Sequence, residues 1–386
     1  MESQVSADKE YNDLIKPIML SGKFICVWPL EKDRPIHKKL LHICHLFWLL
    51  FVLLSMCVTV TTDTILHFDD LVEFTECALW SSVFYLTIVR LIIFMTHQKD
   101  MAYVVETMRK DWICSSYEDR VVLKEKCHFA FRLSKIFISM VYGTVICFSC
   151  LPILEIFIQG GQRILPFHGY FFINQTVSPV YECIYVFNVM GGFFAGGTIC
   201  GATSFSLMAT IHGSAKFVVL QKKLEAITSN DPHVDRALAN CVKRHQDAIA
   251  FADALERTIN VLALAQFVIS TGLVCFAGFQ ITSMIQNKAL LMEYGMFLQA
   301  AVLELFMFSF SGNALIEESD AVGESAYRSG WIGGTFGRSL QIVIMRSKVP
   351  SRITAAKFYS MSLETFSRVL STSFSYITVL MAAKEE

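Results

Sequence analysis

Apolar residues form six runs along the chain, and each run is long enough, at about 20 residues, to cross a bilayer as a helix. Polar segments separate the runs, and no Pro/Gly/Ser-rich linker, low-complexity tract or internal repeat divides the chain. The pattern predicts a single all-α membrane domain over 1–386, with a hydroxyl-rich seventh helix after the six. The predicted spans are 40–61, 71–96, 136–158, 182–211, 259–286, 294–316 and 355–383.

The seventh predicted helix differs from the others because one of its sides is polar. From Ser360 onward, polar and small side chains recur three or four residues apart, which places them on one stripe of a helix. A hydroxyl-rich side within a membrane needs protein or water against it rather than lipid, so we expect this helix to border an aqueous path. The polar stripe comprises Glu364, Ser367, Ser371, Ser375, Thr378 and Ala382, and a separate apolar stripe comprises Leu363, Phe366, Leu370, Phe374, Ile377 and Met381.

The composition agrees with a membrane protein that crosses the bilayer several times. Hydrophobic residues make up 54% of the 386 residues and charged residues 17%, which is typical of polytopic membrane proteins. A net charge of −1 indicates no preference for nucleic acid. The polar first twelve residues do not resemble a cleaved leader, so the first apolar run is expected to act as an uncleaved signal anchor.

The distribution of lysine and arginine predicts the orientation. The segments 1–39, 97–135, 213–257 and 317–352 together carry 27 of these residues, and the alternate segments carry three. By the positive-inside rule the amino terminus is cytosolic, and with seven spans the carboxyl terminus is extracellular. This is opposite to the topology of a G-protein-coupled receptor. The sequon at Asn174 falls in the outer segment 159–181, where we expect glycosylation.

The cytosolic segment 213–257 shows apolar residues at helical spacing, with charges on the other faces. Such amphipathic helices indicate that transmembrane helices continue into the cytosol and pack there, although solvated loops with helical fragments are the alternative. A helical layer of this kind needs partners for its apolar faces. We therefore expect it to form an anchor layer between subunits.

Several residues within the spans are candidates for special roles. Glu304 lies in the middle of the sixth span and is expected to bond a neighbouring helix, whereas Arg90 is expected to snorkel toward the cytosol. A run of glycines in 191–201 predicts close helix packing or, alternatively, space for a ligand. Cys77 and Cys183 lie near outer ends and are candidates for a disulfide. No nucleotide-binding, zinc-protease or nucleophile-elbow motif occurs, so no enzymatic activity, cofactor or metal is expected.

Motifs in about the last 150 residues resemble those of the insect odorant receptor family. Gly330 stands where many members have Asn, and upstream of the signature the run 241–246 matches the family's cytosolic helix before the fifth span. The amino-terminal half resembles the family in layout and length only. The residues that carry the resemblance are Leu303-Glu304-Leu305-Phe306, Phe310-Ser311-Gly312-Asn313-Ala314-Leu315-Ile316, Glu318-Ser319 and Ala326-Tyr327-Arg328-Ser329-Gly330-Trp331, followed by Met345-Arg346-Ser347, Pro350, Thr354-Ala355, Ser362-Leu363-Glu364-Thr365-Phe366, Val369-Leu370 and Ser375-Tyr376.

The resemblance implies a seven-helix subunit of an odorant-gated, non-selective cation channel in the plasma membrane of a sensory neuron. Four subunits would surround one pore built by the seventh helices, with a cytosolic anchor between them. The compact segment 213–257 resembles a tuning subunit, which would assemble with the common odorant co-receptor and bind a volatile small molecule. A gustatory-type channel subunit is an alternative, although its usual tail pattern is absent after Thr372. A polytopic transporter is the less favoured alternative, because neither duplicated halves nor clustered ionisable residues appear.

The resemblance also implies where the sites lie. An odorant would sit in the outer half of the membrane between the second and sixth spans, where apolar area and shape dominate recognition. Val379 would form a narrow hydrophobic constriction that gates by dewetting, with hydroxyls lining a wider vestibule below it. Alternatively, these hydroxyls bond their own backbone or neighbouring helices. The candidate ligand-binding residues are Trp80, Phe84, Cys147, Leu151, Tyr185, Met190, Phe194, Phe276, Phe279, Tyr294 and Phe297, and the candidate pore residues are Ser375, Tyr376, Thr378, Val379 and Ala382.

Overall fold

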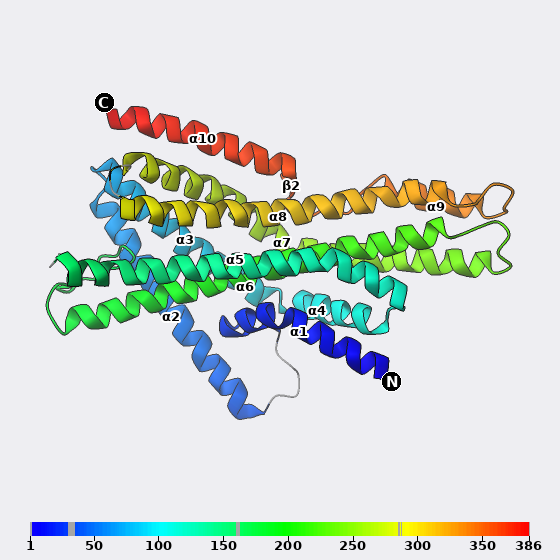
Figure 1. Ribbon diagram of the computed structural model, residues 1–386, viewed down its shortest axis with the longest axis horizontal. Coiled ribbons are helices and arrows are strands. Elements are labelled where there is room, and N and C mark those ends of the chain that lie inside the picture. Colours follow the sequence, from blue (N-terminus) through cyan, green and yellow to red (C-terminus); the bar gives the residue numbers. More distant parts are fainter. Residues whose placement is uncertain (1, 30–34, 160–162, 285, 287, 386) are drawn as a thin grey trace.

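The computed structural model describes residues 2–29, 35–159, 163–284, 286 and 288–385 as an elongated bundle of helices (Figure 1). The predicted spans and segments also include residues 1, 30–34, 160–162, 285, 287 and 386, which lie outside the described residues. The helices are α1 (Glu2–Phe24), α2 (Ile36–Leu66), α3 (Leu71–Thr96), α4 (Gln98–Cys114), α5 (Tyr117–Gln159), α6 (Val180–Glu225), α7 (Val234–Ser283), α8 (Lys288–Arg328), α9 (Gly337–Ser347) and α10 (Leu363–Glu385).

Six of the described helices are long and apolar enough to cross a bilayer, namely α2, α3, α5, α6, α7 and α8. Each contains one of the first six predicted spans, apart from the last residues predicted for 259–286. The polar cap of α3 is typical of a helix start, because Asp70 accepts hydrogen bonds from the backbone N–H groups of Val72 and Glu73. Helices α6 and α7 continue well beyond the predicted spans, as the amphipathic pattern of 213–257 indicated.

The seventh predicted span begins later than expected. Residues 354–360 form a short antiparallel hairpin of β1 (Thr354–Ala355) and β2 (Tyr359–Ser360), and α10 starts only at Leu363. The hairpin is held to α7, because the Glu256 carboxylate accepts a hydrogen bond from the backbone N–H of Thr354 at 2.7 Å. Two residues at its turn, Ala356 and Lys357, have positive φ, which a continuous helix cannot accommodate.

The two ends of the bundle carry different connections (Figure 1). The turn between α2 and α3, the segment between α5 and α6 and the carboxyl terminus lie at one end, which we call the outer end. The turns after α6 and α8 lie at the opposite end, where Ser229 N–H donates to the Gly330 carbonyl at 2.8 Å. The extensions of α6, α7 and α8 with α9 therefore form a long helical projection on the side predicted to be cytosolic.

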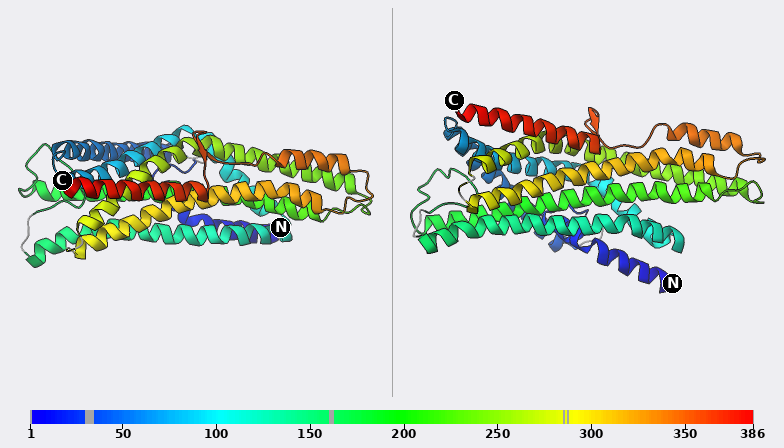
Figure 2. Two further views of the ribbon diagram at one scale, coloured as in Figure 1. Left: turned by 90° about the horizontal axis from the view of Figure 1, so that it is seen from above. Right: turned by 45° about the horizontal axis from the view of Figure 1, so that its top comes forward.

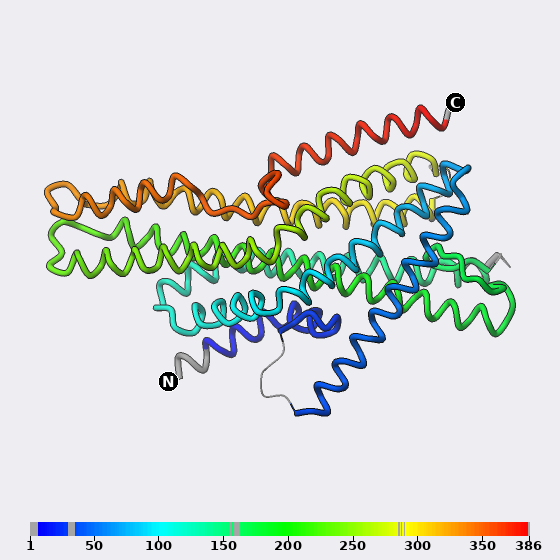
Figure 3. The backbone as a smooth tube through the Cα atoms, turned by 180° about the vertical axis from the view of Figure 1, so that it is seen from behind, coloured from blue at the N-terminus to red at the C-terminus, as the bar shows by residue number. Residues whose placement is uncertain are grey.

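Helix α6 occupies the centre of the molecule. It packs against α1, α2, α3, α5, α7 and α8, and almost every side chain from Gly191 to Ala215 is buried. A helix that is apolar on all sides is expected in such a position. Figure 3 shows α2 crossing the bundle obliquely from behind, and Figure 2 shows α10 on the outside of the bundle. Among the described elements, helix α10 packs mainly against α7 and α8, so much of its surface is left uncovered by this part of the chain.

Candidate functional site

An apolar cavity of about 80 Å³ lies inside the outer half of the bundle, among α3, α5, α6, α7 and α8. A single water needs only about 10–15 Å³ on this measure, so the cavity has room for a small organic molecule. These helices contain the second to sixth predicted spans. The lining residues are Trp80, Val83, Phe84, Phe137, Val141, Thr144, Val145, Phe148, Phe167, Gly192, Ala195, Gly196, Ile199, Leu273, Phe297, Ala300, Ala301 and Glu304.

Aromatic rings close the outer end of the cavity. The Trp80 ring lies edge-on to Phe148 at 4.8 Å and to Phe167 at 4.9 Å between centroids, which is a favourable aromatic geometry. Phe167 comes from the segment between α5 and α6, and the buried amide of Asn188 holds it in place. The Phe167 N–H donates to Asn188 Oδ1 at 3.0 Å, and Asn188 Nδ2 donates to the Phe167 carbonyl at 2.8 Å. The described part of this segment, 163–179, therefore covers the cavity at Phe167.

The glycine run of α6 gives the close helix packing expected of it, and two of its glycines also line the cavity. Gly192 and Gly196 line the cavity, and a Cβ at Gly192 would collide with the Phe167 ring. The other glycines of the run admit side chains from elsewhere in the bundle. Gly191 faces Met56, Gly197 faces Phe24 and Ile25, and Gly201 faces Ile25.

A buried polar network forms the inner end of the cavity. The Glu304 carboxylate accepts hydrogen bonds from Arg90 Nη2 at 2.7 Å, from the Thr203 hydroxyl at 2.6 Å and from Gln266 Nε2 at 3.1 Å. Four helices, α3, α6, α7 and α8, thus meet at one carboxylate. Glu304 makes the inter-helix bonds expected of it. The expectation that Arg90 snorkels is wrong, because its side chain is fully buried and paired with Glu304.

The candidate ligand-binding residues divide into two groups. Trp80, Phe84 and Phe297 line the cavity, where the Trp80 and Phe297 rings lie 5.7 Å apart. Of the others, Phe194 instead packs against the rings of Phe24 and His45, toward α1 and α2. The residues outside the lining are Cys147, Leu151, Tyr185, Met190, Phe194, Phe276, Phe279 and Tyr294.

Sequence reasoning missed most of the cavity wall that α5 provides. Phe137, Val141 and Val145 lie on one face of α5 at four-residue spacing. This spacing could have identified them, but the candidate ligand-binding residues were selected by their depth in the membrane and by aromatic type. Phe167 lies outside every predicted span. No periodicity marks it, because the segment that carries it is irregular.

The candidate pore residues lie together on the uncovered face of α10. Ser375, Tyr376, Thr378, Val379 and Ala382 are all exposed in the single chain, with 62% of Val379 accessible. Several hydroxyls of this helix, including Ser375 and Thr378, donate to carbonyls of their own helix. These intrahelical bonds satisfy the hydroxyl protons and leave oxygen lone pairs free on the exposed face.

The opposite face of α10 is attached to α7. The buried Ser373 hydroxyl donates to the Thr271 carbonyl at 3.1 Å, and Ile377 packs directly over Gly278, where a Cβ would collide with it. Between these two contacts, α7 presents Leu273 to the cavity. One stretch of α7 therefore touches both the cavity and α10.

Asn174 is exposed in the segment between α5 and α6, and its side-chain oxygen accepts hydrogen bonds from the N–H and hydroxyl of Thr176. The sequon is therefore accessible at the outer end. Cys77 and Cys183 are both free, so the candidate disulfide is not formed. Cys77 instead lies against a histidine and a carboxylate, and Cys183 is exposed.

A larger cavity of about 680 Å³ lies in the opposite half of the molecule, where charged and apolar side chains line it together. Several of its charged groups are paired across the helices, since Lys216 contacts Asp111 at 2.6 Å and Lys223 contacts Asp119 at 2.9 Å. His212 Nε2 lies 3.0 Å from the same Asp111 carboxylate. We interpret this space as a gap between the helical extensions, and the apolar cavity as the candidate functional site.

Comparison with known proteins gives consistent results. A sequence model of the family described as 7tm Odorant receptor matches residues 70–374. Odorant receptor 13a of Drosophila melanogaster is 26% identical over 394 residues, covering 92% of this chain and 91% of that protein. The odorant receptor coreceptor of Aedes aegypti is 31% identical over 157 residues, covering 39% of this chain and 32% of the coreceptor. The structure of the insect olfactory receptor OR5 from Machilis hrabei in complex with eugenol matches with a TM-score of 0.85, covering 97% of this chain and 100% of that chain at 14% identity. The likeness shows a common fold.

Proposed function

This chain belongs to the 7tm odorant receptor family, and from that premise we propose that it is the odorant-binding subunit of a heteromeric, ligand-gated, non-selective cation channel. It is a multi-pass membrane protein, and its family is one of receptors rather than enzymes. Family membership favours this role over a gustatory-type subunit or a transporter. The proposed partner in the channel is the odorant co-receptor, a relative in sequence.

The apolar cavity is the observation that supports odorant binding most directly. Volatile molecules offer few hydrogen bonds, so their affinity comes from burial of apolar area and from shape. The cavity supplies aromatic and aliphatic walls, and Glu304 and Thr144 are its few polar groups. We assign the odorant to this space, with Trp80, Phe84 and Phe297 as contacts.

Helix α7 offers a physical route from the cavity to the pore. An odorant that fills the space beside Leu273 pushes on the stretch of α7 that also holds Ser373 and Ile377 of α10. A shift of α7 therefore moves α10. In the proposed tetramer, Val379 forms the hydrophobic constriction, and the movement widens it until water and cations enter.

The same proposal gives the chain its place in the membrane. The amino terminus is cytosolic and the carboxyl terminus extracellular, so the end of the bundle that carries Asn174 faces the outside of a sensory neuron. The projection of α6, α7, α8 and α9 would form the anchor between neighbouring subunits. The apolar side chains of 213–257, among them Leu220, Phe251 and Leu255, are buried within the chain itself, so contacts between subunits would use the exposed side chains of this projection.

Co-expression in oocytes tests the function. The chain is expressed with the odorant co-receptor, and a panel of volatile molecules is applied while current is recorded. We expect at least one volatile to evoke a cation current that the co-receptor alone does not give. Trp80→Ala should raise the half-maximal concentration at least about tenfold, a loss of about 1.4 kcal/mol of contact.

Two controls distinguish a loss of odorant binding from misfolding of the chain. Tyr85→Ala changes a half-exposed residue of the same helix outside the cavity lining and should leave odorant potency unchanged. An agonist of the co-receptor should still open channels that contain Trp80→Ala. Loss of both responses in the Trp80 variant would indicate misfolding, and equal odorant potency in all three forms would contradict the assignment of the cavity.

A further inference from the structure

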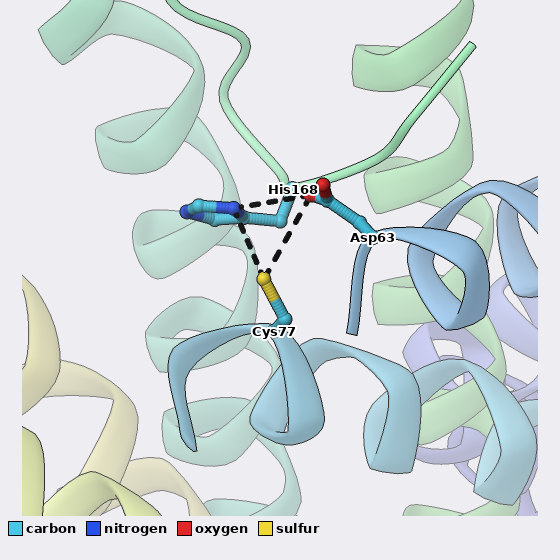
Figure 4. A group of neighbouring side chains, drawn as sticks. All are labelled: Asp63, Cys77 and His168. Atoms are coloured by element: carbon cyan, nitrogen blue, oxygen red, sulfur yellow. Dashed lines mark hydrogen bonds and ion pairs between the residues drawn. The ribbon is translucent and has the colours of Figure 1, made fainter. Parts of the chain in front are cut away.

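Three side chains of different chemistry meet at the outer end of the bundle and are not used by the function above. Asp63 lies in the last turn of α2, Cys77 near the start of α3, and His168 in the segment between α5 and α6. Figure 4 shows their side chains pointing toward one another. Their ligating atoms lie within 4.8 Å of each other, so a carboxylate, a thiol and an imidazole share one point in space.

The separations of these atoms match three corners of a tetrahedral zinc site. Zinc lies about 2.3 Å from sulfur and about 2.0–2.1 Å from nitrogen or oxygen, so tetrahedral angles place sulfur about 3.5 Å from the other ligands and nitrogen about 3.3 Å from oxygen. Cys77 Sγ lies 3.4 Å from His168 Nδ1 and 3.7 Å from Asp63 Oδ2. His168 Nδ1 lies 3.3 Å from Asp63 Oδ2. An ion fits between these atoms with shifts of a few tenths of an ångström.

The surroundings of His168 have the arrangement that supports a metal-bound imidazole. Its second ring nitrogen, Nε2, lies 3.1 Å from Glu76 Oε1, and the Tyr294 hydroxyl donates to the same carboxylate oxygen. A carboxylate behind the imidazole fixes its tautomer and makes the other nitrogen a better ligand. Glu76 therefore occupies the place of the outer-sphere carboxylate found in zinc sites.

The cluster also attracts positive charge. The carboxylates of Asp63 and Glu76 both lie against His168, at 3.3 Å and 3.1 Å from its ring nitrogens. Within the described part of the chain, neither Asp63 nor Glu76 forms an ion pair with a lysine or arginine. The His168 side chain is 35% exposed, which leaves a path for an ion and for a water as fourth ligand.

We propose that Asp63 Oδ2, Cys77 Sγ and His168 Nδ1 bind a divalent transition-metal ion of the Zn²⁺ class, and that this ion fastens the segment carrying Phe167 over the odorant cavity. Binding would displace the protons of the thiol and of the imidazole into solvent. His168 directly follows Phe167, so the metal would tie the cavity cover to α2 and α3 in addition to the Asn188 clamp. The metal site stands on its own geometry, whereas its effect on an odorant rests on the proposed function.

Metal binding is tested on the purified full chain in lipid nanodiscs, with Co²⁺ as a spectroscopic probe and Zn²⁺ as competitor. We expect one Co²⁺ per chain, a thiolate-to-cobalt charge-transfer band, and loss of that band when Zn²⁺ is added. Cys77→Ser, which keeps the side-chain shape, should abolish the band. Cys183→Ser, at an exposed cysteine of the same end, should retain it. Glu76→Gln should weaken binding by about 10- to 100-fold.

The outcomes separate the alternatives. Absence of the band in the folded wild-type chain, or a band that survives Cys77→Ser, would overturn the metal site and leave a hydrogen-bonded cluster. Hydrogen exchange then tests the fastening: Zn²⁺ should slow exchange of the backbone amides in 167–173 in the wild type and not in Cys77→Ser. Unchanged exchange despite metal binding would overturn the effect on the cover. Neither measurement requires an odorant or a conducting channel, so both are independent of the proposed function.

Discussion

At the scale of single residues, the buried ion pair of Arg90 with Glu304 links helices inside the bundle. A charged group deep in a membrane protein is stable only when it is paired and hydrogen-bonded. Glu304 satisfies this requirement with donors from three other helices. The pair therefore fixes the relative positions of the helices that surround the cavity, and it brings a carboxylate oxygen within reach of a bound guest.

Removing one partner of this pair should be much more harmful than removing both. We expect Glu304→Gln to destabilise the folded chain by about 3–5 kcal/mol, because Arg90 keeps a buried charge without its counter-charge. The double variant Arg90→Met with Glu304→Gln should recover most of that loss. Thermal unfolding of purified protein and surface expression would measure both. A double variant as unstable as the sum of the two single changes would argue against an ionic role.

Some of these single-residue contacts could be predicted from the sequence, and others could not. The mid-span position of Glu304 predicted an inter-helix bond, because an unpaired carboxylate is costly in a membrane. The partner was not predictable, since Arg90 lies over 200 positions earlier and only folding brings the two together. Phe167 and His168 were also hidden, because an irregular segment has no period from which its inward-facing side chains can be identified.

At the scale of elements, helix boundaries were the more predictable part of the fold. The span 71–96 coincides with α3, because an apolar run between polar caps defines a membrane helix. The start of α10 was misplaced because the hydroxyl periodicity continues backward from Leu363 through Ser360. The hairpin at 354–360 depends on contacts with Glu256 and Asn260 of α7, which the local pattern does not record.

The contact of α7 with α10 gives a prediction for gating. Gly278→Ala adds a methyl group against Ile377, and overpacking of this kind costs about 1–3 kcal/mol. The packed arrangement seen here is therefore disfavoured relative to arrangements in which α10 has moved away. We expect a higher basal current and a lower odorant concentration for half-maximal response, measured in oocytes with the co-receptor.

A matched control lies on the same helix. Gly272→Ala places its methyl group 3.8 Å from the nearest side-chain atom, Phe276 Cε2, and should leave gating unchanged. If the two alanine variants behave alike at equal surface expression, the α7 contact does not transmit the signal to α10.

At the scale of the whole molecule, the orientation in the membrane determines which side the cavity cover and the pore constriction face. The charge count predicts that the outer end faces the extracellular side, and the segment between α5 and α6, which carries Asn174 and Phe167, lies at that end with the carboxyl terminus (Figure 1). An odorant would thus enter from the same side on which the pore constriction lies. The long projection at the opposite end remains available for contacts between subunits.

Glycosylation tests this orientation. The chain made in insect cells should migrate faster after enzymatic removal of N-linked glycan, and Asn174→Gln should migrate at that faster position without treatment. Equal mobility of the wild type and the variant, with no change on deglycosylation, would contradict an extracellular position for 163–179.

In the proposed channel, an odorant in the buried cavity opens a pore lined by the uncovered face of α10. The most direct measurement is modification of Val379→Cys by a charged, thiol-reactive reagent applied outside during odorant-evoked current, with Ser373→Cys on the buried face as control. We expect block of the current in Val379→Cys, faster when odorant is present, and no block in Ser373→Cys or in the unaltered chain. Persistence of the full current in Val379→Cys after the reagent has demonstrably reacted would contradict the proposal.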